Sequence, residues 1–290
     1  MVSGIDRAVG PAITRRMLLA AACAALPAIG RAKGPSAFGL EIYSLRGNAE
    51  KDLPATLAII REFGFTEVEV SELYGHSATE FRRLLDGAGL RATSMMAGYQ
   101  QLANGAGSVA ADAHTLGADY VVASTIPHKK LFTAEIAASA AEDFGRWGKE
   151  LAGSGLHLCY HTHGVEFGKS PDGTLFDTLV RRTDPRYVNF EMDIFWIVFA
   201  FQDPAKLLRK YPGRFPLMHV KDIRKGTVLG GSPGDVLEEA SVPLGAGIVD
   251  IPAALRAARE TGVRHYYIED EAVNAAQQIP ESLQYLERVR

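Results

Sequence analysis

Two histidines stand two residues apart at the end of an apolar run in the middle of the chain. The run covers residues 156–160, and His161 and His163 follow it directly, with Glu166 three residues further on. In a β-strand, residues i and i+2 point to the same face, so both imidazoles would project together where the strand leaves the core. Such a pair could bind a metal, exchange a proton or form structural hydrogen bonds, and the pattern alone leaves all three open.

Ionisable residues at the same i, i+2 spacing end other strand-like runs as well. These pairs are Glu67 and Glu69, Glu191 and Asp193, His219 and Lys221, and Glu269 and Glu271. If the fold brings the pairs together, burying so many charges costs free energy unless a cation or a hydrogen-bond network organises them. The sequence therefore directs attention to the elements that would position these pairs.

Strand-like and amphipathic helical runs alternate along the chain. Five strand-like runs each follow a glycine, at residues 64, 89, 117, 155 and 262, which suits the left-handed residue that ends a helix. Three more strands begin near residues 38, 187 and 215. The expected strand ends fall near residues 43, 70, 95, 123, 160, 191, 219 and 269.

Eight such units predict one (β/α)8 TIM barrel over residues 33–290. A doubly wound open sheet is the alternative, but it would carry a glycine-rich phosphate turn after the first strand, and residues 43–52 lack one. Barrel enzymes hold their reactive groups at the carboxyl ends of the strands. The ionisable pairs are therefore expected to meet at one mouth of the barrel.

The first 32 residues have a different composition from the rest of the chain. Arg15 and Arg16 precede an apolar, alanine-rich run over residues 17–30, and small residues continue to Ala32. This pattern is typical of a secretory signal peptide of the twin-arginine type. It predicts a periplasmic or secreted protein without stable membrane insertion after cleavage; an uncleaved anchor is the alternative. Cys159 would then be the only cysteine left, so no internal disulfide is expected.

The overall composition is that of a globular protein, with 47% apolar and 22% charged residues. The net charge is −3, and no run of lysine and arginine follows the N-terminal segment. These features give no support to a nucleic-acid partner. A small-molecule partner is expected instead.

The chain resembles the sugar phosphate isomerase/epimerase family, whose members have the xylose isomerase-like TIM barrel. The resemblance extends over residues 38–290 and rests on segments such as "GLEIYSLR", "YHTHGVEF", "FEMDIFWIV", "FPLMHVKD" and "HYYIEDE". It implies one divalent metal ion, bound by ligands at the ends of the fifth to eighth strands. Carried over by position, the metal ligands are His161, Asp193, His219 and Glu269.

His161 stands where most of the family has a glutamate, which resembles the "YHNH" subgroup with Thr162 in place of its asparagine. Two imidazoles with two carboxylates suit Mn²⁺, Zn²⁺, Co²⁺ or Fe²⁺ better than Mg²⁺. The family's ketose epimerases use two glutamates as bases, and an imidazole bound to a metal cannot replace one, because its lone pair is committed. Chemistry with one base, such as isomerisation or elimination, therefore fits better than epimerisation with two.

The resemblance implies a metal-dependent isomerase or epimerase of carbohydrate metabolism that acts on a sugar through an enediolate. Glu269 or His163 would exchange the proton, and Lys221 would hold a substrate oxygen. The substrate site would comprise Tyr43, Glu69, Trp196 and Lys221. A lyase or hydrolase of 3-keto-glycosides and a non-catalytic sugar-binding barrel are the alternatives. Met96 replaces a third-strand histidine of many relatives, which argues against the three-zinc endonuclease branch, and a monomer or homodimer is expected.

Overall fold

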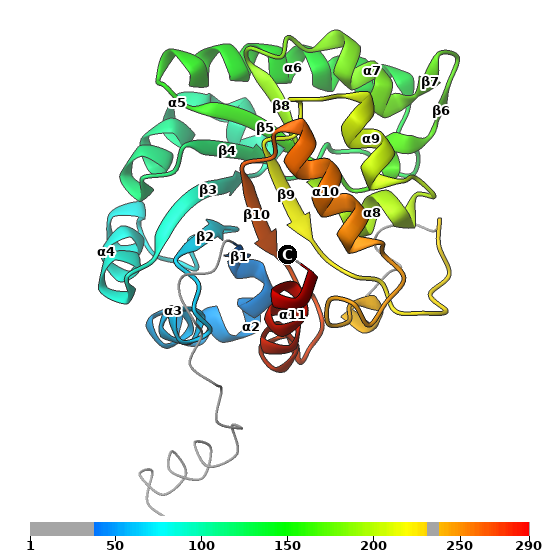
Figure 1. The fold of residues 1–290 in the computed structure, drawn as a ribbon. Coiled ribbons are helices and arrows are strands. Elements are labelled where there is room, and N and C mark those ends of the chain that lie inside the picture. The colour runs from blue at the N-terminus through cyan, green and yellow to red at the C-terminus, as the bar shows by residue number, and fades with distance from the viewer. Residues whose placement is uncertain (1–37, 231–237, 290) are drawn as a thin grey trace, which may run out of the picture. The chain divides into compact units, whose positions relative to one another are not determined.

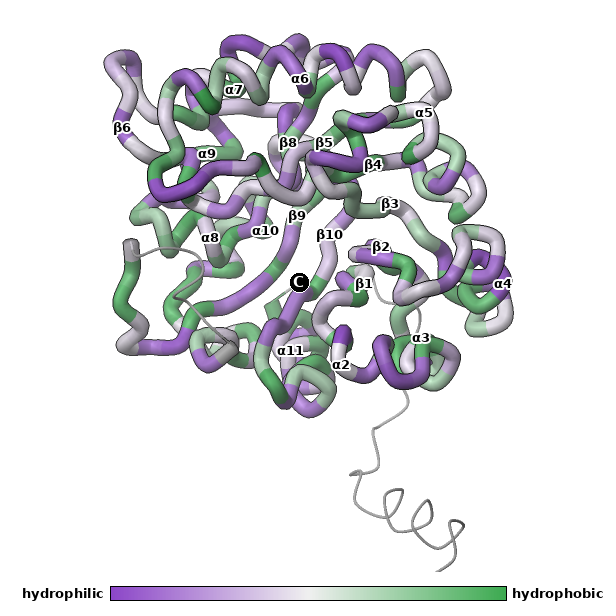
Figure 2. The backbone as a smooth tube through the Cα atoms, turned by 180° about the vertical axis from the view of Figure 1, so that it is seen from behind, coloured by the Kyte–Doolittle hydropathy of each residue, from purple (hydrophilic) through white to green (hydrophobic). Residues whose placement is uncertain are grey.

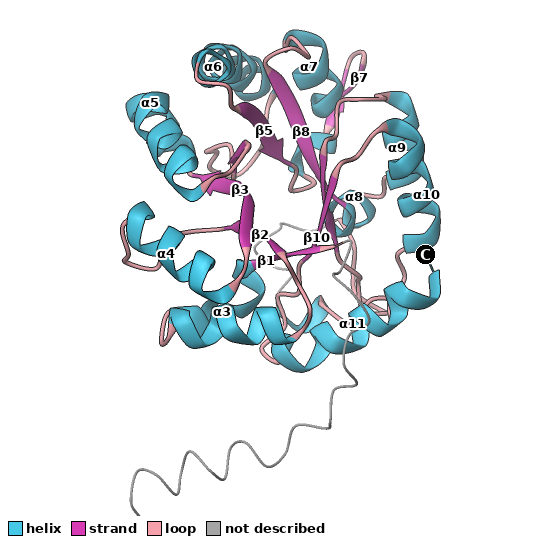
Figure 3. Cartoon of the chain, turned by 60° about the vertical axis from the view of Figure 1, so that its left-hand side comes forward, coloured by secondary structure: helices cyan, strands magenta, loops and turns pink. Residues whose placement is uncertain are grey.

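Eight parallel strands close into a barrel in the computed structural model, which describes residues 38–230 and 238–289. Their order round the barrel is β1-β10-β9-β8-β5-β4-β3-β2, and Figures 1 and 3 show the helices arranged outside the strands. The strands are β1 (Gly39–Glu41), β2 (Glu67–Val70), β3 (Arg91–Ala97), β4 (Tyr120–Ala123), β5 (His157–His161), β8 (Val188–Asp193), β9 (Leu217–Val220) and β10 (His265–Ile268). The predicted TIM barrel is confirmed, and the open sheet is wrong.

The helices follow the strands along the chain. They are α2 (Arg46–Ala49), α3 (Leu53–Glu62), α4 (Ala78–Ala88), α5 (Tyr99–Leu116), α6 (Ala134–Gly153), α7 (Leu175–Arg182), α8 (Ile194–Phe199), α9 (Pro204–Lys210), α10 (Ile251–Thr261) and α11 (Ala275–Val289). A hairpin of β6 (Lys169–Ser170) and β7 (Gly173–Thr174) lies outside the barrel sheet. Hydrophilic and hydrophobic stretches alternate along helices such as α4 and α6 in Figure 2, as expected where one helix face is buried.

Local sequence signals account for the helix ends. Asp52 caps α3 by accepting a hydrogen bond from the backbone of Ala55, and Ser77 and Glu80 form a capping box at α4. The five glycines that precede strands all have φ between +68° and +96°. That region is open to glycine at little cost, and so each glycine can end a helix and turn the chain into the next strand.

The inside of the barrel is filled by its own small cluster of side chains. It consists of Tyr120, Val122, Cys159, Leu217 and Tyr267, with Met96 packed against it. Cys159 is fully buried there, and burial raises the pKa of its thiol. Cys159 therefore has the environment of a buried packing residue rather than that of a nucleophile.

The first strand ends earlier than its sequence suggests. Strand β1 stops at Glu41, and residues Ile42–Leu45 form a 3₁₀ helix in which the side chain of Glu41 accepts from the backbone of Tyr43. Glu41 is therefore the last strand residue, and Tyr43 lies in the turn above it.

The expected signal peptide, residues 1–32, falls outside the part of the chain that the structure describes. Among the helices of residues 38–230 and 238–289, none is long and apolar enough to cross a membrane.

Candidate metal centre

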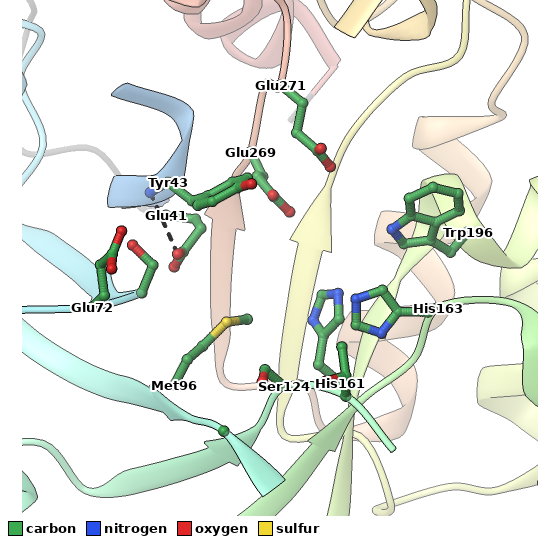
Figure 4. Close-up of a pocket in the computed structure, with 13 residues that line it drawn as sticks. Glu41, Tyr43, Glu72, Met96, Ser124, His161, His163, Trp196, Glu269 and Glu271 are labelled. Atoms are coloured by element: carbon green, nitrogen blue, oxygen red, sulfur yellow. Dashed lines mark hydrogen bonds between the residues drawn. The ribbon is translucent and has the colours of Figure 1, made fainter. Parts of the chain in front are cut away.

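A cavity of about 490 Å³ lies at the carboxyl ends of the barrel strands. Figure 4 shows two facing walls: Glu41, Tyr43, Glu269 and Glu271 on one side, and His161, His163 and Trp196 on the other. Its volume is within the usual range for a small-molecule site. The strand ends that carry the ionisable pairs therefore meet at one mouth of the barrel, as expected.

Three of the four expected metal ligands converge beside this cavity, and one of them, His161, lines it. One ligand atom from each of His161, Asp193 and His219 lies within 4.8 Å of the other two, and all three residues are buried. Nε2 of His161 is 3.7 Å from Oδ2 of Asp193. That carboxylate oxygen has no hydrogen bond to the described residues, although Nζ of Lys221 lies 3.3 Å away. A buried oxygen without a hydrogen bond, facing two imidazoles, fits a divalent cation.

The fourth expected ligand, Glu269, is turned toward neighbouring residues. Its Oε2 is 2.7 Å from Nδ1 of His219 and 3.1 Å from Nζ of Lys221. Burial alone would raise the pKa of Glu269, but the charges of Lys221 and His219 hold it well below its usual range. Glu269 is therefore an ionised carboxylate beside the cavity, close enough to His219 to approach an ion bound there.

Buried carboxylates behind the two imidazoles determine how the rings are oriented. Nδ1 of His161 is 2.8 Å from Oε2 of Glu191, and Nε2 of His219 is 2.6 Å from Oε2 of Glu69. Each contact occupies one ring nitrogen and turns the other toward Asp193 or Glu269. Burial, reinforced by the charge of Glu69, raises the pKa of Glu191 to about 8. Such a raised pKa is typical of acidic side chains crowded together in a buried site, and a cation bound beside the three converging ligands would favour the ionised form of Glu191.

The other predicted site residues divide into two groups. Tyr43, His163 and Trp196 line the cavity, whereas Glu69 and Lys221 do not. Glu69 is fully buried and accepts from Ser94 Oγ at 2.9 Å, so its position beneath His219 replaces the substrate contact expected from the sequence.

The two basic residues near the cavity differ in charge. Nζ of Lys221 lies 2.5 Å from Oε1 of Glu271 in addition to its contacts with Asp193 and Glu269. Burial would lower the pKa of Lys221, but these carboxylates raise it well above its usual value. Burial lowers the pKa of His163 to about 4. Near neutral pH, the lysine is therefore a cation held by carboxylates, and His163 is a neutral imidazole.

Sequence reasoning missed Glu41 and left Glu191 without a role. Both are fully buried at the site, and each has one carboxylate oxygen without a hydrogen bond to the described residues. A signal for Glu41 was present, because it alternates with outward-facing Leu40 and pairs in register with Glu69. It was overlooked because the strand was expected to continue to Tyr43.

Known proteins with similar sequences include a dehydratase. Inosose dehydratase 2 of Bacillus cereus is 31% identical over 129 residues, which is 40% of this chain and 42% of that protein. The chain thus matches about two fifths of the length of this relative.

Solved structures resemble the chain over nearly its whole length. A sugar phosphate isomerase/epimerase from Parabacteroides distasonis ATCC 8503 is 25% identical with a TM-score of 0.69, covering 90% of this chain and 96% of that one. The IOLI protein, whose crystal structure has a bound zinc atom, is 15% identical with a TM-score of 0.66, covering 87% and 95%. Residues 57–289 match the family model of the xylose isomerase-like TIM barrel. The chain therefore belongs to the xylose isomerase-like TIM barrel family, as its strand-end motifs predicted.

Proposed function

We propose that the protein is a metal-dependent enzyme that removes a proton from the carbon beside a carbonyl group of a sugar or cyclitol derivative. The observation that carries this proposal is the convergence of His161, Asp193 and His219 within 4.8 Å at a cavity of small-molecule size. A divalent ion bound there would polarise the substrate carbonyl and stabilise the enediolate that forms on loss of the proton. The donor set suits Mn²⁺, Zn²⁺, Co²⁺ or Fe²⁺.

Glu269 is the best placed proton acceptor if it does not itself complete the metal site. Its carboxylate lines the cavity, and Lys221 and His219 keep it ionised. The neutral imidazole of His163 also lines the cavity, and its Nδ1 has no hydrogen bond to the described residues. Glu269 would exchange the substrate proton, and His163 would hold a substrate oxygen or take over the exchange.

Lys221 acts on the site through its carboxylate partners in this proposal. Its side chain is only 2% exposed, and three carboxylates surround its ammonium group. It therefore positions Glu269 and Glu271 rather than contacting the substrate. The substrate would lie between Tyr43 and Trp196, whose rings belong to opposite walls of the cavity (Figure 4).

Elimination of a substituent two carbons from the carbonyl is the outcome that we favour over isomerisation. A dehydratase expels water, and inosose dehydratases are among the similar proteins. The replacement of the family's usual fifth-strand glutamate by His161 also leaves Glu269 as the remaining member of that pair of bases, and elimination needs only one base to remove the proton. A 3-keto-glycoside would lose its aglycone by the same route, and isomerisation is the second candidate.

Incubation of the metal-loaded protein with keto-sugars, inososes and 3-keto-glycosides in D₂O tests the proposal. Deuterium is expected at the carbon beside the carbonyl, and elimination would in addition release water or the aglycone and form a conjugated enone. An isomerase would incorporate deuterium without losing a substituent. Metal binding without exchange on any of these compounds would favour the sugar-binding barrel instead.

We also propose that residues 1–32 direct export by the twin-arginine route to the periplasm or the outside of the cell. The support is the pair Arg15 and Arg16 before an apolar run. N-terminal sequencing of the mature protein should give a first residue just after Ala32. An intact N-terminus in the cytoplasmic fraction would contradict this.

A further inference from the structure

A second cavity, of about 230 Å³, shares His163 with the metal-site cavity. The ring of His163 is 4.6 Å from that of His161 and 6.2 Å from that of Trp196, measured between ring centres. Apart from His163 and three glycines, the second cavity is lined by Val165, Phe167, Phe199, Ala200 and Phe201. A ligand held at the metal residues and extending past His163 would therefore reach a cavity whose other described lining residues are apolar side chains and glycines.

Phe201 occupies a backbone position that usually belongs to glycine. Its φ is +59°, and it follows the end of α8, where its N–H donates to the carbonyl of Val198 and the N–H of Gln202 donates to that of Ile197. This pair of hydrogen bonds is the Schellman motif that ends many helices with a left-handed residue. A side chain at this position costs free energy that glycine would avoid.

The side chain of Phe201 is also unusually exposed. It is 71% exposed, one of the most exposed large apolar side chains in the described part of the chain. One edge of the ring is packed closely on Gly230, where an added Cβ would come within 2.4 Å of the ring. The N–H of Gly230 donates to the carbonyl of Phe199 at 2.9 Å, which holds the glycine in place. The ring is thus positioned by the backbone while its surface faces outward.

Neither the helix end nor the core explains a phenylalanine at this position. Glycine or asparagine would satisfy the left-handed backbone, and a polar residue would suit the exposed surface. Strained residues and exposed apolar patches are both concentrated at binding sites. The two features coincide here, at the edge of a cavity that shares a wall with the metal site.

We propose that Phe201 and the second cavity bind a planar apolar group, such as the aromatic aglycone of a glycoside, whose sugar ring lies in the metal-site cavity. This assignment rests on the proposed function for the sugar end of the ligand. None of the described residues that line the second cavity is charged, which suits a neutral group. His163 lines both cavities and therefore lies where the two halves of the ligand would join.

The test compares 4-nitrophenyl and methyl β-D-glucopyranosides, and their 3-oxo derivatives, as ligands of the metal-loaded full chain by calorimetry. The wild-type protein is expected to bind the aryl compounds roughly tenfold more tightly than the methyl compounds. Phe201→Gly should abolish this difference and raise Tm slightly, since the strain is removed. Phe201→Asn should also abolish the preference for aryl compounds, whereas Phe201→Trp should retain this preference because an aromatic ring is present.

Leu131→Gly is the matched control, because Leu131 is 76% exposed and lines neither cavity. It should leave the preference for aryl compounds unchanged. Equal affinity of the wild-type protein for aryl and methyl compounds, including no binding of either, would overturn the proposal. So would a preference that persists in Phe201→Gly.

Deuterium exchange on free keto-sugars tests the proposed function separately. Aryl selectivity that depends on Phe201 but comes without exchange would refute the proposed function and leave the apolar site standing. Deuterium exchange without aryl selectivity would support the proposed function and refute the apolar site.

Discussion

The imidazole of His161 and the carboxylate of Glu191 are joined by a buried hydrogen bond, with 2.8 Å between Nδ1 and Oε2. The two residues are also partners in register on strands β5 and β8. This contact leaves Nε2 of His161 facing Asp193. Glu191 therefore fixes the ring of a proposed metal ligand without reaching the cavity.

Replacing Glu191 with alanine should weaken metal binding. Loss of a carboxylate behind a metal-binding histidine typically costs about 10–100-fold in affinity. Competition with a chelator of known affinity would measure the change. Glu67→Ala is the matched control, because Glu67 is a half-buried glutamate bound to Arg91 and His265, away from the proposed ligands. Equal losses in both variants would refute a specific role for Glu191.

Removing a ligand should abolish metal loading. The wild-type protein is expected to purify with about one divalent ion per chain, and Asp193→Ala or His219→Ala with almost none. Elemental analysis gives the content directly. Metal at 100 times its Kd should also stabilise the wild-type fold by about 2.7 kcal/mol, and it should not shift the Tm of either variant. Full occupancy in both variants would contradict the assignment.

Stability should depend on the aromatic cluster behind strands β8 and β9. Phe176 is fully buried, and its ring lies within 4.8–6.0 Å of the rings of Phe167, Phe190, Tyr211 and Phe215. Phe176→Ala should therefore lower the free energy of unfolding by about 3–5 kcal/mol, measured by urea denaturation. Phe201→Ala serves as the comparison, since its exposed ring should cost far less. Similar losses would show that Phe201 is more buried than the structure indicates.

Glu67 should contribute to stability in a pH-dependent way. A hydrogen bond from His265, aided by Arg91, lowers its pKa to about 2. Because the folded pKa is below the unfolded value, the ionised form stabilises the fold above about pH 4.5, and this is lost as the pH falls toward 2. Glu67→Gln should therefore be less stable than wild type at pH 6 and approach it near pH 2. A constant difference across this range would contradict the prediction.

Much of the fold could be read from local patterns. Local features of the fold depend on neighbours in the chain and can therefore be recognised in the sequence. They include glycines with positive φ, helix caps such as Asp52, and alternating apolar residues. The order of strand and helix was therefore predictable, and it placed His161, Asp193 and His219 at strand ends. Their role as candidate metal ligands was implied by the family resemblance.

The expectations that the structure corrects concern how deeply a side chain is buried in the barrel and where a strand ends. Glu69 was expected to touch the substrate, but its side chain is fully buried against His219 and Ser94. Glu41 replaced Tyr43 as the end of the first strand because a 3₁₀ turn begins there. How far along a strand the barrel mouth begins depends on the stagger between neighbouring strands, which a linear sequence does not display.

Periodicity and residue type were thus enough to establish the barrel and the residue types available at its mouth. Distances between side chains from different strands came from the closed sheet, because they depend on how the strands are tilted and packed. The strained and exposed position of Phe201 was likewise not predictable from the sequence. Its φ follows from the hydrogen bonds that end α8, and the residues around it form no pattern that indicates strain.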